Sequence, residues 1–178
     1  DYDAIEKMGY PVFIKPNSGG SSVATFKVEC REDVEDAVRA GLEVDDIVMI
    51  EAYLPGDEYT SFVLDGEVYP TIKISSPTGF FDFESKYSTG ANAAKEEVVY
   101  LEKDLQDQIN KASKAVWDTF YCRAYVRADF ILSNGTFYVL ELNTLPGMTP
   151  TSLIPRSANA KGLSYSELVD KIMETSLK

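Results

Sequence analysis

Residues 127–143 constrain the fold most, because two strand-like runs there flank the short polar segment Ser133-Asn134-Gly135. Runs rich in β-branched and aromatic residues, joined by a short loop that contains glycine, predict a β-hairpin. Gly135 can adopt the left-handed backbone conformation that such a loop requires. With a three-residue loop at residues 133–135, Leu132 lies opposite Thr136.

This register divides the hairpin into an apolar face and a polar face. A two-residue loop would place Asp129 and Glu141 on opposite faces, so the alternation of side chains favours the three-residue loop. The expected apolar face consists of Val126, Ala128, Phe130, Leu132, Tyr138, Leu140 and Leu142. The expected polar face consists of Arg127, Asp129, Glu141 and Asn143. Two carboxylates and an amide oxygen suit Mg²⁺, although an ion-pair network on a solvated sheet face is the alternative.

The composition limits which kinds of function are possible. The 178 residues are 44% hydrophobic and 26% charged, which suits one large globular domain or two small ones. The net charge of -12 argues against nucleic acid or an anionic membrane as a partner. The absence of histidine excludes Ser-His-Asp catalysis, Cys-His catalysis and histidine-ligated metals. We expect Cys30 and Cys122 to be reduced thiols in the core, and the sequence contains no recognisable signal peptide or membrane-spanning run.

The N-terminal part predicts a small strand-loop-strand unit followed by a helix. The expected elements are a strand at residues 11–16, a loop at 17–22, a strand at 23–29 and an amphipathic helix at 32–42. The loop is rich in glycine and serine and could fold over phosphate groups, with Lys15 at its base. A plain surface turn is the alternative.

The middle of the chain predicts further strands and one irregular segment. The expected elements are a strand at residues 47–54 and a hairpin of residues 58–64 and 67–74. Glu51 and Glu58 flank a Pro-Gly connection, where they could accept hydrogen bonds from an adenine amino group and a ribose hydroxyl, or simply be solvated. Residues 75–97 are irregular and rich in aromatic side chains, which is typical of a lid or binding loop; a small aromatic cluster is the alternative.

Two helices are expected in the C-terminal part. Residues 102–120 form the clearest helix, whose stripe of Leu105, Ile109, Ala112, Val116 and Phe120 should cover the apolar face of the hairpin. Residues 144–153 are expected to form a turn-rich loop. A capping box of Ser164 and Glu167 begins a final helix, with Leu168, Ile172 and Met173 on its apolar stripe.

The chain contains, in sequence order, a strand ending at Lys15, a glycine-serine loop, two glutamates around a strand end, and a hairpin with clustered carboxylates. This order of features resembles that of ATP-grasp enzymes and, more narrowly, of the D-alanine-D-alanine ligases. The resemblance runs from about Gly9 to the C-terminus, and its motifs are Lys15-Pro16, Gly20-Ser21-Ser22-Val23, Glu84-Ser85-Lys86-Tyr87, Arg127-Ala128-Asp129-Phe130 and the run from Glu141 to Thr149. It implies an α+β ATP-grasp fold with antiparallel sheets flanked by helices. Residues 1–50 would then belong to the central ATP-binding subdomain and residues 51–178 to the C-terminal catalytic domain, with a mobile loop at about 75–97.

The resemblance also implies roles for individual residues. The metal ligands would be Asp129, Glu141 and Asn143, which hold two Mg²⁺ ions, with Mn²⁺ as a possible substitute. The contacts to ATP would come from Lys15, Ser22, Glu51, Leu54, Glu58, Phe80, Lys86 and Leu140. Among these, the lysines would bind phosphate oxygens, and Glu51, Leu54 and Glu58 would hold adenine and ribose. The catalytic set would be Arg127, which stabilises the developing oxyanion, Ser152, which binds the carboxylate of the second substrate, and the pair Ser21 and Tyr87, which closes the site.

The implied reaction is the ATP-dependent joining of two D-alanine molecules through an acyl phosphate, for peptidoglycan synthesis in the cytoplasm. Alternatives are a D-alanine-D-lactate ligase, another carboxylate-amine ligase, and a non-catalytic Mg²⁺-nucleotide-binding module. Members of this family carry an additional N-terminal domain and are usually dimers. We therefore expect a fragment that folds, at least from about Glu51 onward, but does not turn over alone, and a homodimer at full length.

Overall fold

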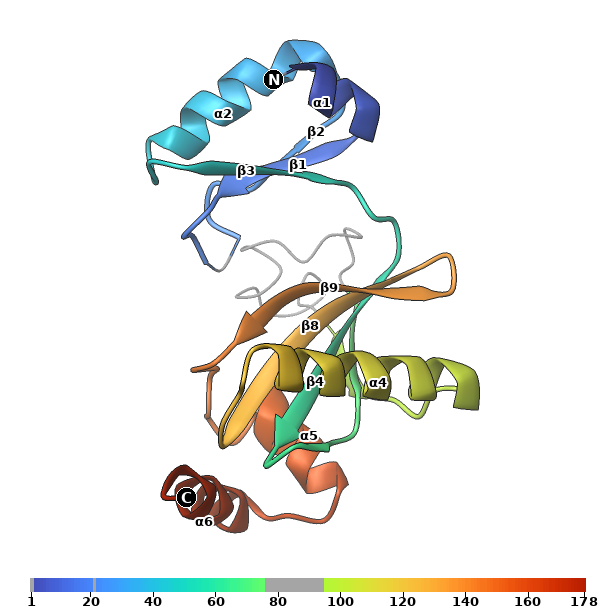
Figure 1. The fold of residues 1–178 in the computed structure, drawn as a ribbon, viewed down its shortest axis with the longest axis vertical. Coiled ribbons are helices and arrows are strands. Elements are labelled where there is room, and N and C mark those ends of the chain that lie inside the picture. The colour runs from blue at the N-terminus through green and yellow to red at the C-terminus, as the bar shows by residue number, and fades with distance from the viewer. Residues whose placement is uncertain (1, 21, 76–94) are drawn as a thin grey trace. The chain divides into compact units, whose positions relative to one another are not determined.

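The computed structural model describes residues 2–20, 22–75 and 95–178, which divide into two compact units (Figure 1). The first unit contains the described residues up to Leu54, and the second contains Pro55–Ser75 and Lys95–Lys178. Within the described residues, no helix is both long enough and apolar enough to cross a membrane. The cysteines Cys30 and Cys122 are free, but neither is a fully buried core thiol, because Cys30 is exposed and Cys122 is half-buried.

The first unit is a small antiparallel sheet that carries helices on one face. Its elements are α1 (Tyr2–Met8), β1 (Val12–Pro16), β2 (Phe26–Val28), the 3₁₀ helix η1 (Arg31–Asp33), α2 (Val34–Leu42) and β3 (Val48–Ala52). The strands follow the order β2-β1-β3, and α1 and α2 lie on the same side of them (Figure 1). Because side chains alternate along a strand, Val12 and Ile14 of β1 enter the core with Ile5 and Val34, while Lys15 faces the other side.

The second strand of this unit is shorter than the predicted strand at residues 23–29. β2 contains only Phe26–Val28, because the chain turns before it. Ser22 and Ala24 have positive φ values of 58° and 52°, which a regular strand does not allow. The turn therefore extends the glycine-serine loop at the expense of the strand.

The second unit is a six-stranded antiparallel sheet with helices on both faces. Its elements are β4 (Asp57–Leu64), β5 (Glu67–Val68), β6 (Ile72–Ser75), β7 (Lys95–Val98), α4 (Lys103–Thr119), β8 (Tyr125–Ser133), β9 (Thr136–Asn143), α5 (Leu153–Ala160) and α6 (Tyr165–Ser176). The described strands follow the order β7-β6-β4-β8-β9, and β5 pairs with β4. On one face, Ile109 and Val116 of α4 pack on Ala128 and Phe130 of β8. On the other face, α5 and α6 pack on β4, chiefly around Phe62.

Most predicted elements of this unit are confirmed, with corrections at their ends. The stripe of α4 covers the hairpin as expected, but Phe120 lies past the helix and is 62% exposed. The capping box of Ser164 and Glu167 begins α6, whereas Met173 is exposed rather than packed. Residues 95–97 were expected in the loop but lie in β7, an edge strand too short and too polar to stand out in the sequence.

The hairpin of β8 and β9 has a two-residue loop, so the predicted three-residue loop is wrong. Ser133 pairs with Thr136, and Asn134 and Gly135 have positive φ values of 49° and 77°, as favoured hairpin turns require. A register shift follows farther along the ladder, where Phe130 pairs with Val139 but Asp129 pairs with Glu141. The extra residue of this β-bulge is Leu140.

Between the loop and the bulge, the residues on the apolar face of the hairpin differ from those predicted. On the other side of the bulge, the polar face has the predicted residues. Phe137, rather than Tyr138, packs with Phe130 and the α4 side of the sheet, and Tyr138 is 44% exposed. Leu140 was expected on the apolar face and instead lies within the bulge. Beyond the bulge the ladder resumes with Glu141 opposite Asp129. The predicted polar face therefore forms because of the bulge and not because of a three-residue loop.

Candidate functional site

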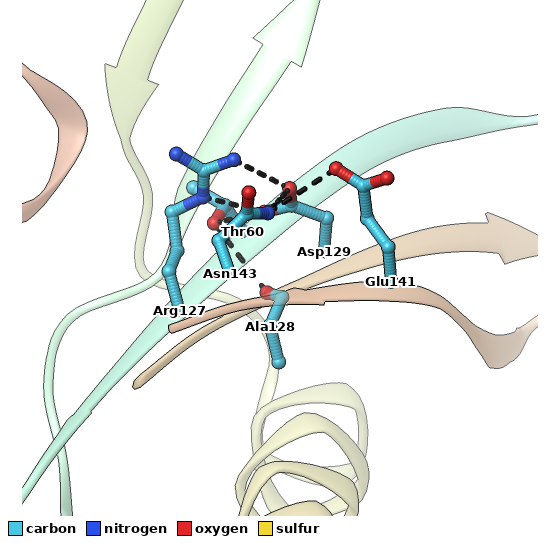
Figure 2. A network of polar contacts seen from close by, with 6 residues as sticks. All are labelled: Thr60, Arg127, Ala128, Asp129, Glu141 and Asn143. Carbon is cyan, nitrogen blue, oxygen red and sulfur yellow. Dashed lines mark hydrogen bonds and ion pairs between the residues drawn. The ribbon is translucent and has the colours of Figure 1, made fainter. Parts of the chain in front are cut away.

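The polar face of the β8-β9 hairpin gathers four of the predicted site residues. Arg127 pairs with Asn143, and Asp129 pairs with Glu141 across the two strands. Residues directly opposite each other in an antiparallel ladder project their side chains on the same face. Figure 2 shows the four side chains converging above the sheet.

Asp129 is the centre of this cluster. Arg127 donates from Nε to Asp129 Oδ1 at 2.9 Å and from Nη2 to Asp129 Oδ2 at 2.7 Å. The amide nitrogen of Asn143 lies 3.0 Å from Asp129 Oδ2 and 3.2 Å from Glu141 Oε1, so it bridges the two carboxylates (Figure 2). The side chain of Asp129 is only 7% exposed, and that of Arg127 is 18% exposed. The two charges are therefore largely withdrawn from water and satisfied by each other.

The charge of Arg127 is secured by its neighbours. Burial opposes the positive charge of the guanidinium, but its hydrogen bonds to Asp129 and the nearby negative charges, including Glu141, outweigh that effect. The pKa of Arg127 is raised as a result. The guanidinium is thus a permanent cation at this site.

Thr60 is a member of the cluster that sequence reasoning missed. Its hydroxyl donates to Asp129 Oδ1 at 2.6 Å from the neighbouring strand β4, where Thr60 is paired directly with Asp129 (Figure 2). Nothing local in the sequence identifies this threonine. Only the pairing of β4 with β8, which are more than sixty residues apart, brings it to the site.

The donor set fits a hard divalent cation. Asp129 and Glu141 supply carboxylate oxygens, and Asn143 can supply its amide oxygen, which together with phosphate and water is the kind of ligand set that Mg²⁺ prefers. The described residues contain no group of three or more acidic, cysteine or histidine side chains that could hold a metal by themselves. Water, or oxygens from a bound substrate, would complete the coordination of a cation at this face.

In the first unit, Lys15 is held by an ion pair with Glu51. Lys15 Nζ lies 2.5 Å from Glu51 Oε2, and both side chains are about one-third exposed. Glu51 is on β3, next to β1 in the sheet. Ser22 lies in the turn before β2, and Leu54 follows β3 at the end of the unit.

Within the described part of the chain, Ser152 and Leu140 are not among the hydrogen-bond donors to Asp129. Ser152 occupies the N-cap position of α5 without a side-chain capping hydrogen bond, and its hydroxyl accepts a hydrogen bond from the backbone N–H of Thr149 at 3.1 Å. Glu58 lies at the start of β4, and its negative charge contributes to the raised pKa of Arg127. Leu140 lies in the bulge between the two halves of β9. The predicted residues Ser21, Phe80, Lys86 and Tyr87 lie outside the described part of the chain.

A pocket of about 400 Å³ opens where the connection between α4 and β8 meets the end of β9. Its lining consists of Phe120, Tyr121, Cys122, Arg123, Tyr125, Leu142 and Thr144. None of these residues was predicted as part of the site. They come from the connection between α4 and β8 and from the end of β9, so only the folded hairpin brings them together.

Comparison with known proteins places this arrangement in a family. The family model described as the C-terminus of D-Ala-D-Ala ligase matches residues 2–174. The chain is 48% identical to D-alanine-D-alanine ligase B of Clostridium perfringens over 178 residues, which cover 99% of this chain and 58% of that protein.

Solved structures agree with the sequence relatives. The crystal structure of D-alanine-D-alanine ligase from Bacillus anthracis superposes with a TM-score of 0.88 at 42% identity, covering 99% of this chain and 58% of that one. The complex of D-alanine-D-alanine ligase from Bacillus anthracis with ATP gives a TM-score of 0.86 at 37% identity, with 99% and 56% coverage. The predicted ATP-grasp fold is confirmed, and the chain spans less than two thirds of the length of these relatives.

Proposed function

We propose that this chain, which belongs to the D-alanine-D-alanine ligase C-terminus family, is the catalytic part of an ATP-dependent ligase that joins two D-alanine molecules. One observation carries the proposal. A single face of the β8-β9 hairpin gathers a permanent cation, two carboxylates and an amide within hydrogen-bonding distance of one another. This combination suits the transfer of a phosphoryl group, which needs charge neutralisation and positioning more than a strong base.

In the proposed reaction, ATP phosphorylates the carboxylate of the first D-alanine. The amine of the second D-alanine then attacks this acyl phosphate, and phosphate leaves as the peptide bond forms. Asp129, Glu141 and Asn143 are the proposed ligands of two Mg²⁺ ions, for which Mn²⁺ could substitute. Bound there, the ions would neutralise the phosphate oxygens.

Arg127 is the proposed stabiliser of the oxyanion that develops at the attacked carbonyl. Its fixed positive charge and its position beside the carboxylate cluster support this role. Donors of this kind commonly contribute about 2.7 to 4 kcal/mol to the stability of a transition state. We propose Ser152 as the binder of the second D-alanine's carboxylate, and Ser21 and Tyr87 as the pair that closes the site.

Several further residues are the proposed contacts to ATP. Lys15 supplies a positive charge for phosphate oxygens, and its ion pair with Glu51 keeps it positioned in the absence of ligand. The other proposed contacts are Ser22, Leu54, Glu58, Phe80, Lys86 and Leu140. The complete protein is proposed to be a cytoplasmic homodimer.

The first experiment measures ADP release by the protein at the full length of its relatives. It is supplied with Mg²⁺-ATP and D-alanine, with and without D-lactate, and the product is identified by mass. D-Ala-D-Ala from D-alanine alone is the expected product. A lactate-containing product would replace the proposed substrate, and nucleotide binding without any turnover would favour a binding module.

A matched measurement on the 178-residue chain separates binding from turnover. We expect no D-alanine-dependent ADP release from this chain alone, because it covers only 58% of the length of the ligases that it matches. D-alanine-dependent release by the 178-residue chain would contradict this expectation.

A further inference from the structure

Thr60 differs from the other partners of Asp129 because it approaches from a different strand. It lies in β4, is 3% exposed, and is paired directly with Asp129 of β8. Its hydroxyl has a single proton, which is directed to Asp129 Oδ1 at 2.6 Å, while the carbonyl oxygen of Ala128 is farther away at 3.4 Å (Figure 2). A distance of about 2.6 Å is typical of a strong, charge-assisted hydrogen bond from a hydroxyl to a carboxylate.

The two oxygens of Asp129 are fully occupied in this structure. Oδ1 accepts from Thr60 and from Nε of Arg127, and Oδ2 accepts from Nη2 of Arg127 and from the amide of Asn143. A carboxylate offers about four acceptor positions, so these four donors use its capacity. A cation can bind an Asp129 oxygen only if one of these four hydrogen bonds breaks.

The four donors are not equally able to leave. Asn143 can rotate its amide and present oxygen instead of nitrogen, and Arg127 is a long side chain that can follow negative charge developing nearby. Thr60 is a short, β-branched and buried side chain with few accessible rotamers. The hydrogen bond from Thr60 is therefore the one that we expect to remain when a cation binds. It fixes the position of Asp129 Oδ1, so that Asp129 Oδ2 stays next to Asn143 and Glu141.

We propose that Thr60 is a positioning residue of the metal site, which fixes the orientation of the Asp129 carboxylate so that Oδ2 is presented to the cation. This inference rests on the proposed function, because it concerns how this chain's residues receive a divalent cation. Partners that orient a metal ligand typically change metal affinity by about 10- to 100-fold when they are removed.

A purely structural role for the hydroxyl can be separated from this one by a control on the same strand. Ser61 is the next residue of β4, is fully buried, and accepts a hydrogen bond from Ser113 of α4 at 2.9 Å on the opposite face of the sheet. Thr60→Val removes the hydroxyl that contacts Asp129 with little change of shape. Ser61→Ala removes an equally buried hydroxyl that does not contact the site.

The test is the binding of Mn²⁺ alone to the 178-residue chain, followed by electron paramagnetic resonance of the free ion. We expect Thr60→Val to weaken binding by about 10- to 100-fold, as removal of an orienting partner does. Thr60→Ser, which restores the hydroxyl, should bind within about threefold of the unaltered chain, and Ser61→Ala should not differ from it. Thr60→Ala serves as a second hydroxyl-free variant in case valine prevents folding, and circular dichroism verifies the fold of each variant.

Asp129→Asn distinguishes the failure of this inference from the failure of the proposed function. If Asp129→Asn abolishes Mn²⁺ binding while folded Thr60→Val and Thr60→Ala bind normally, the metal site stands and the role of Thr60 is refuted. If the unaltered chain does not bind Mn²⁺, or Asp129→Asn binds it equally well, the proposed metal site itself is wrong and the role of Thr60 falls with it. Equal weakening by Ser61→Ala and Thr60→Val would also refute a specific role for Thr60.

Discussion

Arg127 and Asp129 stabilise the fold only as a pair. Each charge loses hydration on burial, and the loss is offset by two parallel hydrogen bonds between a guanidinium and a carboxylate. Burial opposes the charge of Arg127, but its hydrogen bonds to Asp129 outweigh burial and raise its pKa, so the guanidinium stays charged at neutral pH. The pair therefore loses no stability through deprotonation of Arg127 as the pH rises over the ordinary experimental range.

Removal of Arg127 alone should be more damaging than removal of both charges. Arg127→Met leaves the Asp129 carboxylate buried without its main partner, and we expect a loss of about 3 kcal/mol in the free energy of unfolding. Asp129→Asn in the same background should recover part of that loss, because the unpaired charge disappears. Urea unfolding of the two single variants and the double variant measures the coupling. Strictly additive losses would show that the two side chains act independently.

At the scale of the element, the β8-β9 hairpin depends on two deviations from regular geometry that compensate each other. The two-residue turn at Asn134-Gly135 alone would have placed Asp129 and Glu141 on opposite faces, and the bulge at Leu140 returns them to the same face. The side-chain alternation indicated that one additional residue was needed between the two carboxylates. It did not indicate whether that residue lies in the turn or in the strand.

Two glycines of the second unit should respond very differently to alanine. A Cβ atom at Gly56 would lie 2.0 Å from the carbonyl oxygen of Leu132, whereas a Cβ at Gly135 would have no atom within 4 Å. We expect Gly56→Ala to cost at least about 3 kcal/mol, because β4 and β8 cannot separate without losing their ladder. Gly135→Ala should cost about 1 kcal/mol, which is the strain of its positive φ. Thermal unfolding compares the two, and similar losses would contradict the close approach at Gly56.

The capping box of α6 should give this helix a measurable pH dependence. Hydrogen bonds from the side chain and backbone of Ser164 lower the pKa of Glu167. A lowered pKa means that the stabilisation is present above the unfolded pKa of glutamate and is lost as the pH falls through the folded value. We therefore expect the difference in stability between the unaltered chain and Glu167→Gln to shrink as the solution becomes acidic.

Ser164→Ala tests the same cap without a titrating group. It should cost about 1 kcal/mol at neutral pH, as for other N-cap residues. Chemical denaturation at pH 7 and at pH 3 measures both variants. A Glu167→Gln difference that does not change with pH would show that the carboxylate contributes no charge-dependent stability.

Elements with a strong local pattern could be predicted from the sequence, and those without one could not. α4 and α6 have apolar stripes, and the capping box marks the start of α6. α5 begins at Leu153 within a segment rich in proline and threonine, and its residues reveal their role only when Ile154 packs against Phe62 of β4. β7 is likewise a strand because it pairs with β6, and the local sequence of β7 does not predict this pairing.

The same distinction applies to the site. Arg127, Asp129, Glu141 and Asn143 lie in one hairpin, so their grouping follows from local alternation and was predicted. Thr60 joins them only through the ladder between β4 and β8, which depends on long-range pairing. Their metal-binding and catalytic roles came from resemblance to a family and remain predictions.

At the scale of the whole molecule, the strong negative charge makes the local positive charges important. A net charge of -12 opposes the approach of an anionic nucleotide. Lys15 and Arg127 are both ion-paired to carboxylates in this structure, so their charges are compensated until a ligand competes for them. This is consistent with the proposal that nucleotide binding is accompanied by a divalent cation.

The two units should unfold as separate transitions because each has its own core. Ile14 belongs to the core of the first unit and Ile109 to the α4 core of the second, and the two cores have none of the described residues in common. The single tryptophan, Trp117, lies in α4, so its fluorescence reports the second unit, whereas circular dichroism reports both. Replacement of either buried isoleucine by alanine should cost its own unit about 2 to 5 kcal/mol.

Ile109→Ala should therefore shift the urea transition of Trp117 fluorescence to lower denaturant. Ile14→Ala is its matched control, because it removes the same atoms from an equally buried position in the other core. It should shift part of the circular dichroism signal and leave the fluorescence transition in place, since mutations in separate cores without shared partners act independently. An equal shift of the fluorescence transition by both variants would mean that the units unfold together. The boundary at Leu54 would then separate two groups of contacts, but not two parts of the chain that unfold independently.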